Sequence, residues 1–133
     1  MATITLWKDE KARLLDPALF SIEADRIAQE ISEDGKRDRK EKNKSTQLRR
    51  FFDEIIRLNS QAQAEGTDWN NILPHVHMLV AKTAYAQGRD LVTKSFVDLI
   101  KSGITQIKEK DDLQVFANFL EAFMGFYKVY RPK

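Results

Sequence analysis

Residues 112–130 read DLQVFANFLEAFMGFYKVY, and this stretch decides the fold class. Its apolar residues recur at the spacing of an α-helix, where they form two adjacent stripes. One stripe consists of Leu113, Phe116, Leu120, Met124 and Tyr127, and the other of Phe119, Phe123, Phe126 and Tyr130. Together they cover about half of the helix circumference or more. The sequence therefore predicts a helix that begins after a capping Asp111 or Asp112 and packs against several neighbours.

An apolar arc this wide has two interpretations. The helix can be the central element of a bundle, which is the interpretation we prefer. Alternatively, part of the arc can contact another subunit, because exposed aromatic patches mark interfaces. Phe119, Phe126 and Tyr130 are the candidates for such a contact.

Four other segments carry helix signals. Asp16 and Pro17 are typical of a helix start, and an apolar stripe follows them as far as Gly35. The remaining helices are expected from Ser45 to the break at Gly66, from Pro74 to Gly88, and from about Leu91 to Lys108. Gly103 and Gly125 suggest close helix packing. Alternation typical of a strand appears only in residues 3–7. We expect an all-α fold, a single five-helix bundle over residues 16–133, after a loosely structured N-terminal segment of residues 1–15.

Composition excludes several classes of protein. The 133 residues contain no cysteine, which rules out a disulfide framework, a thiol nucleophile and cysteine-based metal sites. The N-terminus lacks the basic start and apolar run of a signal peptide. No apolar stretch approaches the roughly 20 residues that span a bilayer. We therefore expect a cytoplasmic protein without a membrane partner.

The net charge of +2 conceals a strong local asymmetry. From Lys36 to Arg50 the chain carries eight basic and two acidic residues, a net charge of +6. The remainder has 14 basic and 18 acidic residues and sums to −4. Residues 36–44, called the basic loop below, have almost no apolar side chain and are expected to connect the first two helices. Such a block either contacts a polyanion or is a solvated linker, and composition leaves both alternatives open.

Catalytic patterns are weak throughout the chain. His75 and His77, the only histidines, point about 200° apart on a helix and cannot serve one metal ion together. Adjacent carboxylates such as Asp111 and Asp112 are better explained as helix caps than as an acid–base pair. The sequence has neither a glycine-rich phosphate loop nor a nucleophile elbow. We expect no enzyme activity, no metal, no cofactor and no small-molecule substrate.

Phosphate-binding side chains are better represented. On the second helix Arg50 lies opposite the apolar face, with Arg49 at its flank and Lys44 just before the helix. On the third helix Lys82, Tyr85 and Arg89 share a face away from the core positions. Tyr85 can meet a base or ribose there, or it can be a buried tyrosine with a satisfied hydroxyl. The pattern predicts backbone contacts with nucleic acid and does not choose RNA over DNA. Further candidates in the basic loop are Arg37, Arg39, Lys40 and Lys42.

Three segments resemble the small helical subunit of type III-A CRISPR (Csm) effector complexes. They are STQLRRFF at residues 45–52, KTAYAQGR at residues 82–89, and FLEA at residues 119–122 with YKVY at residues 127–130. They follow the order and spacing of that family over roughly two-thirds of the chain. Each motif alone is weakly specific, and their joint order carries the resemblance.

The resemblance implies a non-catalytic, RNA-binding helical bundle that stabilises an antiviral ribonucleoprotein. Members of that family stack in several copies along the guide RNA–target RNA duplex, beside larger Csm subunits. By motif position, Arg49 and Arg89 become candidate contacts to the RNA backbone. Our reading of the residues adds Arg50, Lys44 and Lys82.

Two other classes remain as alternatives. A helical DNA-binding module would use residues 74–88 as its recognition helix, although that segment offers few side chains that read bases. A helical adaptor that binds only protein would use the aromatic stripe of the last helix. Salt-sensitive binding to RNA, compared with duplex DNA, distinguishes the three classes.

Overall fold

The computed structural model describes residues 2–37 and 39–132, and helices dominate that part of the chain. A 3-10 turn, Pro17–Phe20, precedes α1 (Ile22–Lys36), α2 (Ser45–Gln63), α3 (Trp69–Gly88), α4 (Lys94–Ile104) and α5 (Lys110–Tyr130). Within the described residues there is no strand, only one isolated bridge between Asp9 and Leu14. The prediction of an all-α fold with five helices is confirmed.

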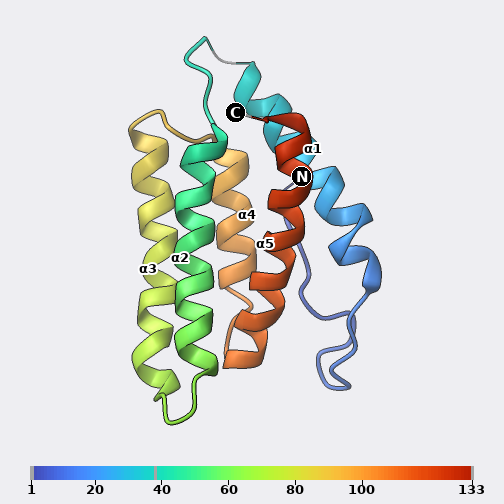
Figure 1. Cartoon of the computed structure of the whole chain (residues 1–133), viewed down its shortest axis with the longest axis vertical. Coiled ribbons are helices and arrows are strands. Elements are labelled where there is room, and N and C mark those ends of the chain that lie inside the picture. The colour runs from blue at the N-terminus through green and yellow to red at the C-terminus, as the bar shows by residue number, and fades with distance from the viewer. Residues whose placement is uncertain (1, 38, 133) are drawn as a thin grey trace.

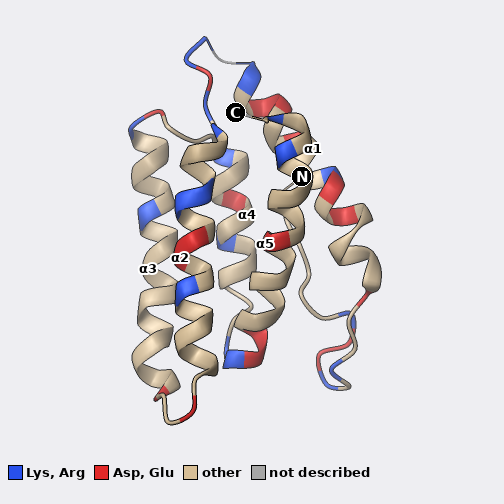
Figure 2. Cartoon of the chain, in the orientation of Figure 1, with Lys and Arg blue, Asp and Glu red and all other residues tan. Residues whose placement is uncertain are grey.

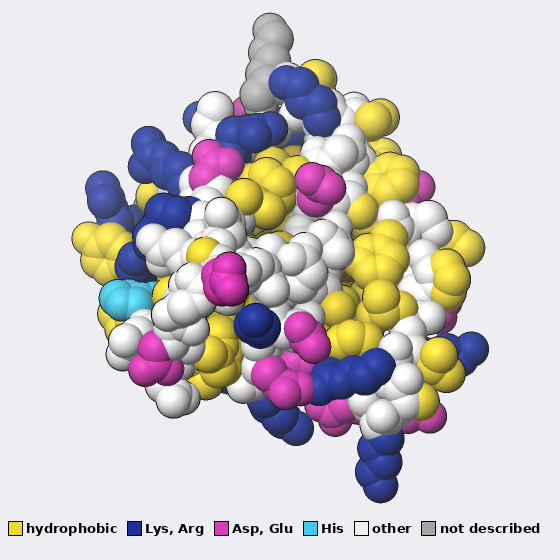
Figure 3. Space-filling model, turned by 60° about the horizontal axis from the view of Figure 1, so that its bottom comes forward, with side chains coloured by type: hydrophobic (Ala, Val, Ile, Leu, Met, Phe, Trp, Pro, Cys, Tyr) yellow, Lys and Arg dark blue, Asp and Glu magenta, His cyan; other side chains and the backbone are white. Residues whose placement is uncertain are grey.

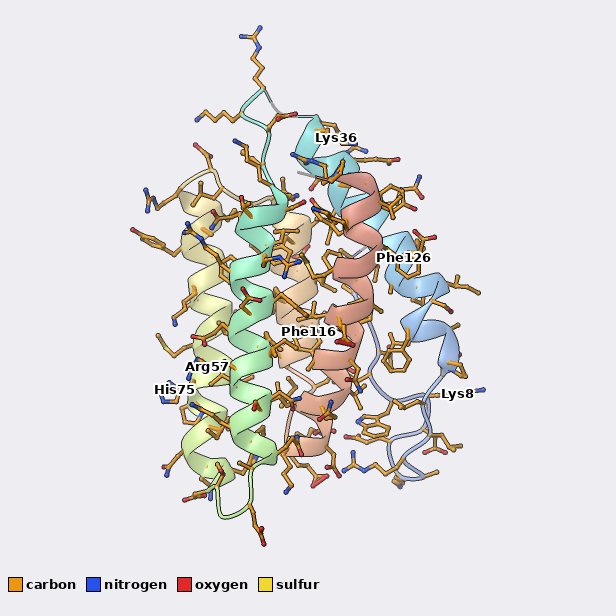
Figure 4. All side chains as sticks on the ribbon, viewed as in Figure 1. Lys8, Lys36, Arg57, His75, Phe116 and Phe126 are labelled. Atoms are coloured by element: carbon orange, nitrogen blue, oxygen red, sulfur yellow. The ribbon has the colours of Figure 1, made fainter. Side chains whose placement is uncertain are left out.

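Helices α2 to α5 stand side by side, and α1 lies across the outer side of α5 (Figure 1). Consecutive helices of the four run in opposite directions, because short connections return the chain to an adjacent position. Helix α5 packs against α1, α2 and α4, which gives its wide apolar arc several partners. Phe116, Phe123 and Tyr127 are fully buried in the common core, and Phe116 points into the bundle in Figure 4. The central position predicted for this helix is confirmed.

Two glycines expected at close helix contacts differ in the structure. A Cβ atom on Gly103 of α4 would lie 2.2 Å from Cε1 of the buried Phe116 ring, so α4 and α5 meet there without room for a methyl group. Gly125 of α5 is exposed, and a Cβ atom there would meet nothing within 4 Å. The packing expectation is therefore confirmed for Gly103 and wrong for Gly125.

Helix α3 begins earlier than the sequence predicts. Pro74 lies inside α3 and does not start it, because Asp68 caps the helix by accepting a hydrogen bond from the Asn70 amide. A proline in the second turn removes only one backbone hydrogen bond, so the helix tolerates it. The end at Gly88 is as expected, but Asp90 takes the left-handed conformation that terminates the helix, with φ of 62°. The Asp90 and Leu91 amides donate to the Gln87 and Ala86 carbonyls, a Schellman arrangement.

The N-terminal segment, for which little regular structure was expected, has no helix before residue 17 but packs against the bundle. Its buried residues are Ala2, Ile4 and Leu6. The Ile4 amide donates to Ser102 Oγ at 3.0 Å, which fixes the segment along α4. Trp7 Nε1 donates to the buried Asp112 carboxylate at 2.8 Å, and the Arg13 guanidinium forms an ion pair with the same carboxylate. These residues thus add to the core of the bundle.

The basic loop is fastened to the bundle at its C-terminal end by Asn43. This side chain is buried, donates to the Ile31 carbonyl and Thr93 Oγ1, and accepts from the Thr93 amide. Its backbone amide donates to the Leu91 carbonyl, and its own carbonyl accepts from the Tyr127 hydroxyl. One residue of the loop therefore joins α1, α5 and the α3–α4 connection.

Candidate nucleic-acid interface

Three of the predicted phosphate-binding residues converge on a single groove between α2 and α3. Arg50 comes from the first half of α2, Lys82 from the second half of α3, and Arg89 caps the end of α3. All three are exposed. The amphipathic pattern of each helix directs these side chains outward, and the antiparallel pairing brings the start of α2 beside the end of α3. Figure 2 shows basic segments on both helices and on the loop at this end of the bundle.

The floor of this α2–α3 groove is apolar. Phe51, Leu79, Ala86 and Leu91 line it beneath the charged rim. Phe51 is partly buried and packs against the Phe96 ring of α4, with 5.6 Å between the ring centroids. Cationic side chains above an apolar floor can bind a ligand that carries both negative charge and a flat apolar surface.

Tyr85 stands on the rim of the groove and is 68% exposed. The alternative of a buried tyrosine with a satisfied hydroxyl is therefore wrong. Residue 85 falls on the outward face of α3, whereas the inward positions are taken by Leu79 and Ala86. The Arg89 guanidinium lies 5.8 Å from the centroid of the Tyr85 ring, within reach of a cation–π interaction.

One carboxylate faces the cations of the groove. Glu54 of α2 pairs with Arg57 at 2.5 Å and with Lys82 at 3.9 Å. The hydrogen bond from Arg57, opposed by partial burial and aided by the charges of Arg57 and Lys82, lowers the pKa of the Glu54 carboxyl. Glu54 is thus held as an anion close to Lys82, while Arg50 has no ion-pair partner among the described residues.

Lys44 and Arg49 lie outside the groove. Lys44 precedes α2 and lines a separate hollow with Lys36, Tyr130 and Arg131. Arg49 is exposed on α2, one position before Arg50, so it points about 100° away from it. Three of the five predicted RNA-binding residues therefore share the groove, whereas Lys44 and Arg49 lie outside it.

The candidates in the basic loop divide into exposed and anchoring side chains. Arg39 is exposed, and Arg37 is exposed with Asp34 at 3.8 Å. Lys40 and Lys42 both pair with Asp90, at 2.9 and 3.5 Å. The Lys42 side chain is only 19% exposed, so its role is to hold the loop against the end of α3. Sequence reasoning missed Asp90 and Asn43, although an aspartate two positions after a helix end is a recognisable signal for a left-handed cap.

The three aromatic residues predicted at a subunit contact have different positions. Phe119 is fully buried and belongs to the core, so it offers no surface to a partner. Phe126, labelled in Figure 4, and Tyr130 are partly buried, and the Tyr130 hydroxyl donates to Asp25 of α1. Only the outer edges of Phe126 and Tyr130 remain for a contact. On the face shown in Figure 3, hydrophobic side chains reach the surface between interspersed basic and acidic ones.

The described residues contain neither a candidate metal site nor a helix that could span a membrane. In residues 2–37 and 39–132 no three His, Cys, Asp or Glu side chains are placed to hold a metal ion. His75 and His77 are both exposed on α3, and His75 lies on its outer side in Figure 4. Among the helices described, none combines the length and apolar character that crossing a bilayer requires.

These features define a small helical-bundle protein with a cationic groove at one end. The model of the Csm2 Type III-A family matches residues 21–133, which covers α1 to α5 and the basic loop. The chain belongs to this family, the small subunit of the type III-A CRISPR complex, and the resemblance stated from the sequence is confirmed. Membership implies assembly with other Csm subunits. Searches of curated proteins and of solved structures found no match.

Proposed function

We propose that this subunit is a non-catalytic RNA-binding component that holds the sugar–phosphate backbone of guide and target RNA and stabilises the complex in antiviral defence. The observation that carries the proposal is the convergence of Arg50, Lys82 and Arg89 on one groove. Contacts to the RNA backbone fix where a protein lies on the RNA but do not recognise its base sequence. In guided complexes, base pairing supplies the sequence specificity.

The cations inside and outside the groove have different parts in this proposal. Arg50, Lys82 and Arg89 bind the phosphates nearest the groove. Lys44 and Arg49 extend the contact toward the basic loop, where Arg37, Arg39 and Lys40 add positive charge around it. Further copies of the chain and larger Csm subunits would continue the same basic surface along the RNA, with Phe126 and Tyr130 near a subunit contact.

Filter binding of single-stranded RNA at several salt concentrations tests the proposal. Each phosphate contact releases condensed counterions, so affinity should fall with a slope of about −0.7 per contact on a log–log plot. Arg49→Ala, Arg50→Ala and Arg89→Ala should each lower affinity by about 1.5- to fivefold on unrelated RNA sequences, because an exposed ion pair contributes about 0.2–1 kcal/mol. Lys101→Ala, on an exposed residue of α4 outside the groove, is the control and should leave affinity unchanged.

Other outcomes assign the chain to the alternative classes. Tighter binding to duplex DNA than to RNA of equal length indicates a DNA-binding module. A loss confined to one RNA sequence means base readout and contradicts the backbone proposal. The absence of any salt-sensitive affinity for RNA, with assembly into Csm subunits intact, indicates an adaptor that binds only protein.

A further inference from the structure

Tyr85 is the exception among the aromatic side chains of this protein. Within the described residues every other phenylalanine, tyrosine and tryptophan is buried or packs against the core. Tyr85 is 68% exposed, and its hydroxyl has no hydrogen-bond partner among those residues. Packing an aromatic ring into a core is favourable, so a ring left in water gains nothing for the fold. Its position on the groove rim calls for another explanation.

The surroundings of Tyr85 match one kind of ligand. Arg89 lies beside the ring, while Arg50 and Lys82 line the same groove. Against these three cations stands one carboxylate, Glu54, which also pairs with Arg57, so the groove keeps an excess of positive charge. An acidic peptide would contact only the cations of the groove, and an apolar peptide would contact only its apolar floor. A nucleotide uses both, because its base is a flat apolar surface joined to a phosphate.

We propose that Tyr85 is a stacking platform for one unpaired base of the bound RNA, with Arg50, Lys82 and Arg89 holding the phosphates on either side of that base. This inference rests on the proposed RNA-binding function and extends it from the backbone to a base. Stacking on an aromatic ring accepts every base, since each has a π-face, so the platform adds affinity without sequence preference. Arg89 extends the platform, because a guanidinium also stacks on planar groups.

The experiment compares intact RNA with RNA of equal length that contains abasic positions, using the full chain. Wild type should bind intact RNA about tenfold more tightly than abasic RNA, as expected for one base–aromatic stack. Tyr85→Ala should bind both at the abasic level with an unchanged salt slope, because no phosphate contact is lost. Tyr85→Trp should restore the preference for intact RNA. A central 2-aminopurine should be quenched on binding wild type and not on binding Tyr85→Ala.

The outcomes separate this inference from the proposed function. If wild type binds abasic and intact RNA equally and the binding still depends on salt, the proposed contacts to the RNA backbone remain supported, but the stacking role of Tyr85 is refuted. If Tyr85→Ala binds intact RNA like wild type but no longer assembles with other Csm subunits, Tyr85 contacts protein and the inference is overturned. If neither RNA binds in a salt-dependent way, the proposed function itself fails. Circular dichroism should show an unchanged fold for Tyr85→Ala, since the side chain is exposed.

Discussion

The Tyr127 hydroxyl donates a hydrogen bond of 2.5 Å to the backbone carbonyl of Asn43. This bond joins the last helix to the basic loop, 84 positions earlier in the chain, and both residues are buried. Burial, opposed only in part by Arg131, raises the pKa of the Tyr127 hydroxyl well above its usual value, so the group remains a proton donor at all physiological pH values.

Tyr127→Phe should therefore destabilise the protein. The change removes one hydrogen bond and leaves a buried carbonyl without that donor, which together cost about 1–2 kcal/mol. Urea unfolding followed by circular dichroism measures the difference in the free energy of unfolding. Tyr130→Phe is the matched control and should cost less, because the Tyr130 hydroxyl bonds to Asp25 near the surface. Equal losses in the two variants would contradict the anchoring role of Tyr127.

Gly103→Ala and Gly125→Ala should have opposite effects on stability. A methyl group at position 103 would overlap the buried Phe116 ring, and overpacking of this kind costs about 1–3 kcal/mol. At position 125 the space is open, and replacing a mid-helix glycine by alanine gains about 0.5–1 kcal/mol. Thermal and urea unfolding of both variants test this pair. A stable Gly103→Ala protein would mean that α4 and α5 are more loosely packed than described.

These two glycines also illustrate what the sequence can and cannot predict. The apolar stripes of α5 and α2 follow from spacing, since an i, i+3, i+4 pattern fixes which face of a helix is buried. Spacing does not give the rotation of one helix relative to its neighbour, so it cannot tell that residue 103 meets Phe116 while residue 125 meets solvent. The start of α3 at Trp69 instead of Pro74 likewise depends on packing, because Trp69 and Ile72 lie against the core.

The same limit applies to the candidate site. Outward placement of Arg50, Lys82 and Arg89 followed from the helical period. Their convergence on one groove, and the separation of Lys44 and Arg49 from it, depends on the pairing of α2 with α3. The sequence did not predict the burial of Lys42, because the loop contains almost no apolar residue. The loop is held to the bundle by polar contacts of Asn43 and Asp90 instead.

Asp90→Asn should weaken the contact between the basic loop and the end of α3, and should strengthen RNA binding. Asparagine accepts the left-handed backbone at position 90, so α3 should end as before. The change removes one negative charge beside Lys40 and Lys42, so the electrostatic potential of the loop becomes more positive and attracts phosphate more strongly. We expect RNA affinity to rise about two- to fivefold and the salt slope to steepen. Glu65→Gln, in the α2–α3 connection at the other end of the bundle, removes an equal charge and should leave the slope unchanged.

Asp34 makes part of the stability depend on pH. Burial alone would raise the pKa of this carboxyl, but hydrogen bonds from Ser95 and Thr93 and the charges of Arg37 and Lys42 outweigh it and lower the pKa below 3.8. A group whose pKa is lowered by folding contributes stability above its unfolded pKa and loses it as the pH falls through the folded value. The bond from Ser95 Oγ, 2.6 Å long, joins α4 to α1.

Melting temperatures of wild type and Asp34→Asn between pH 7 and pH 2.5 test this dependence. The wild type should be the more stable protein above about pH 4, and the difference should shrink at lower pH as Asp34 becomes protonated. Asp111→Asn, at an exposed residue of α5, is the control for the loss of one carboxylate. A difference between wild type and Asp34→Asn that persists at pH 2.5 would show that the charge of Asp34 is not its source.

The fastening of the basic loop has a consequence for how members of this family can diverge. Its stem is fixed by the buried Asn43 and by the Lys42 carbonyl, which lies so near Gly35 that a Cβ atom there would be 2.3 Å away. Its tip includes the exposed Arg39, Lys40 and Glu41, and its contact with the bundle is the surface ion pair between Lys40 and Asp90. Substitution of these exposed side chains can thus change the charge of the tip without disturbing the buried stem, so family members that bind different RNA should vary there first and keep the stem.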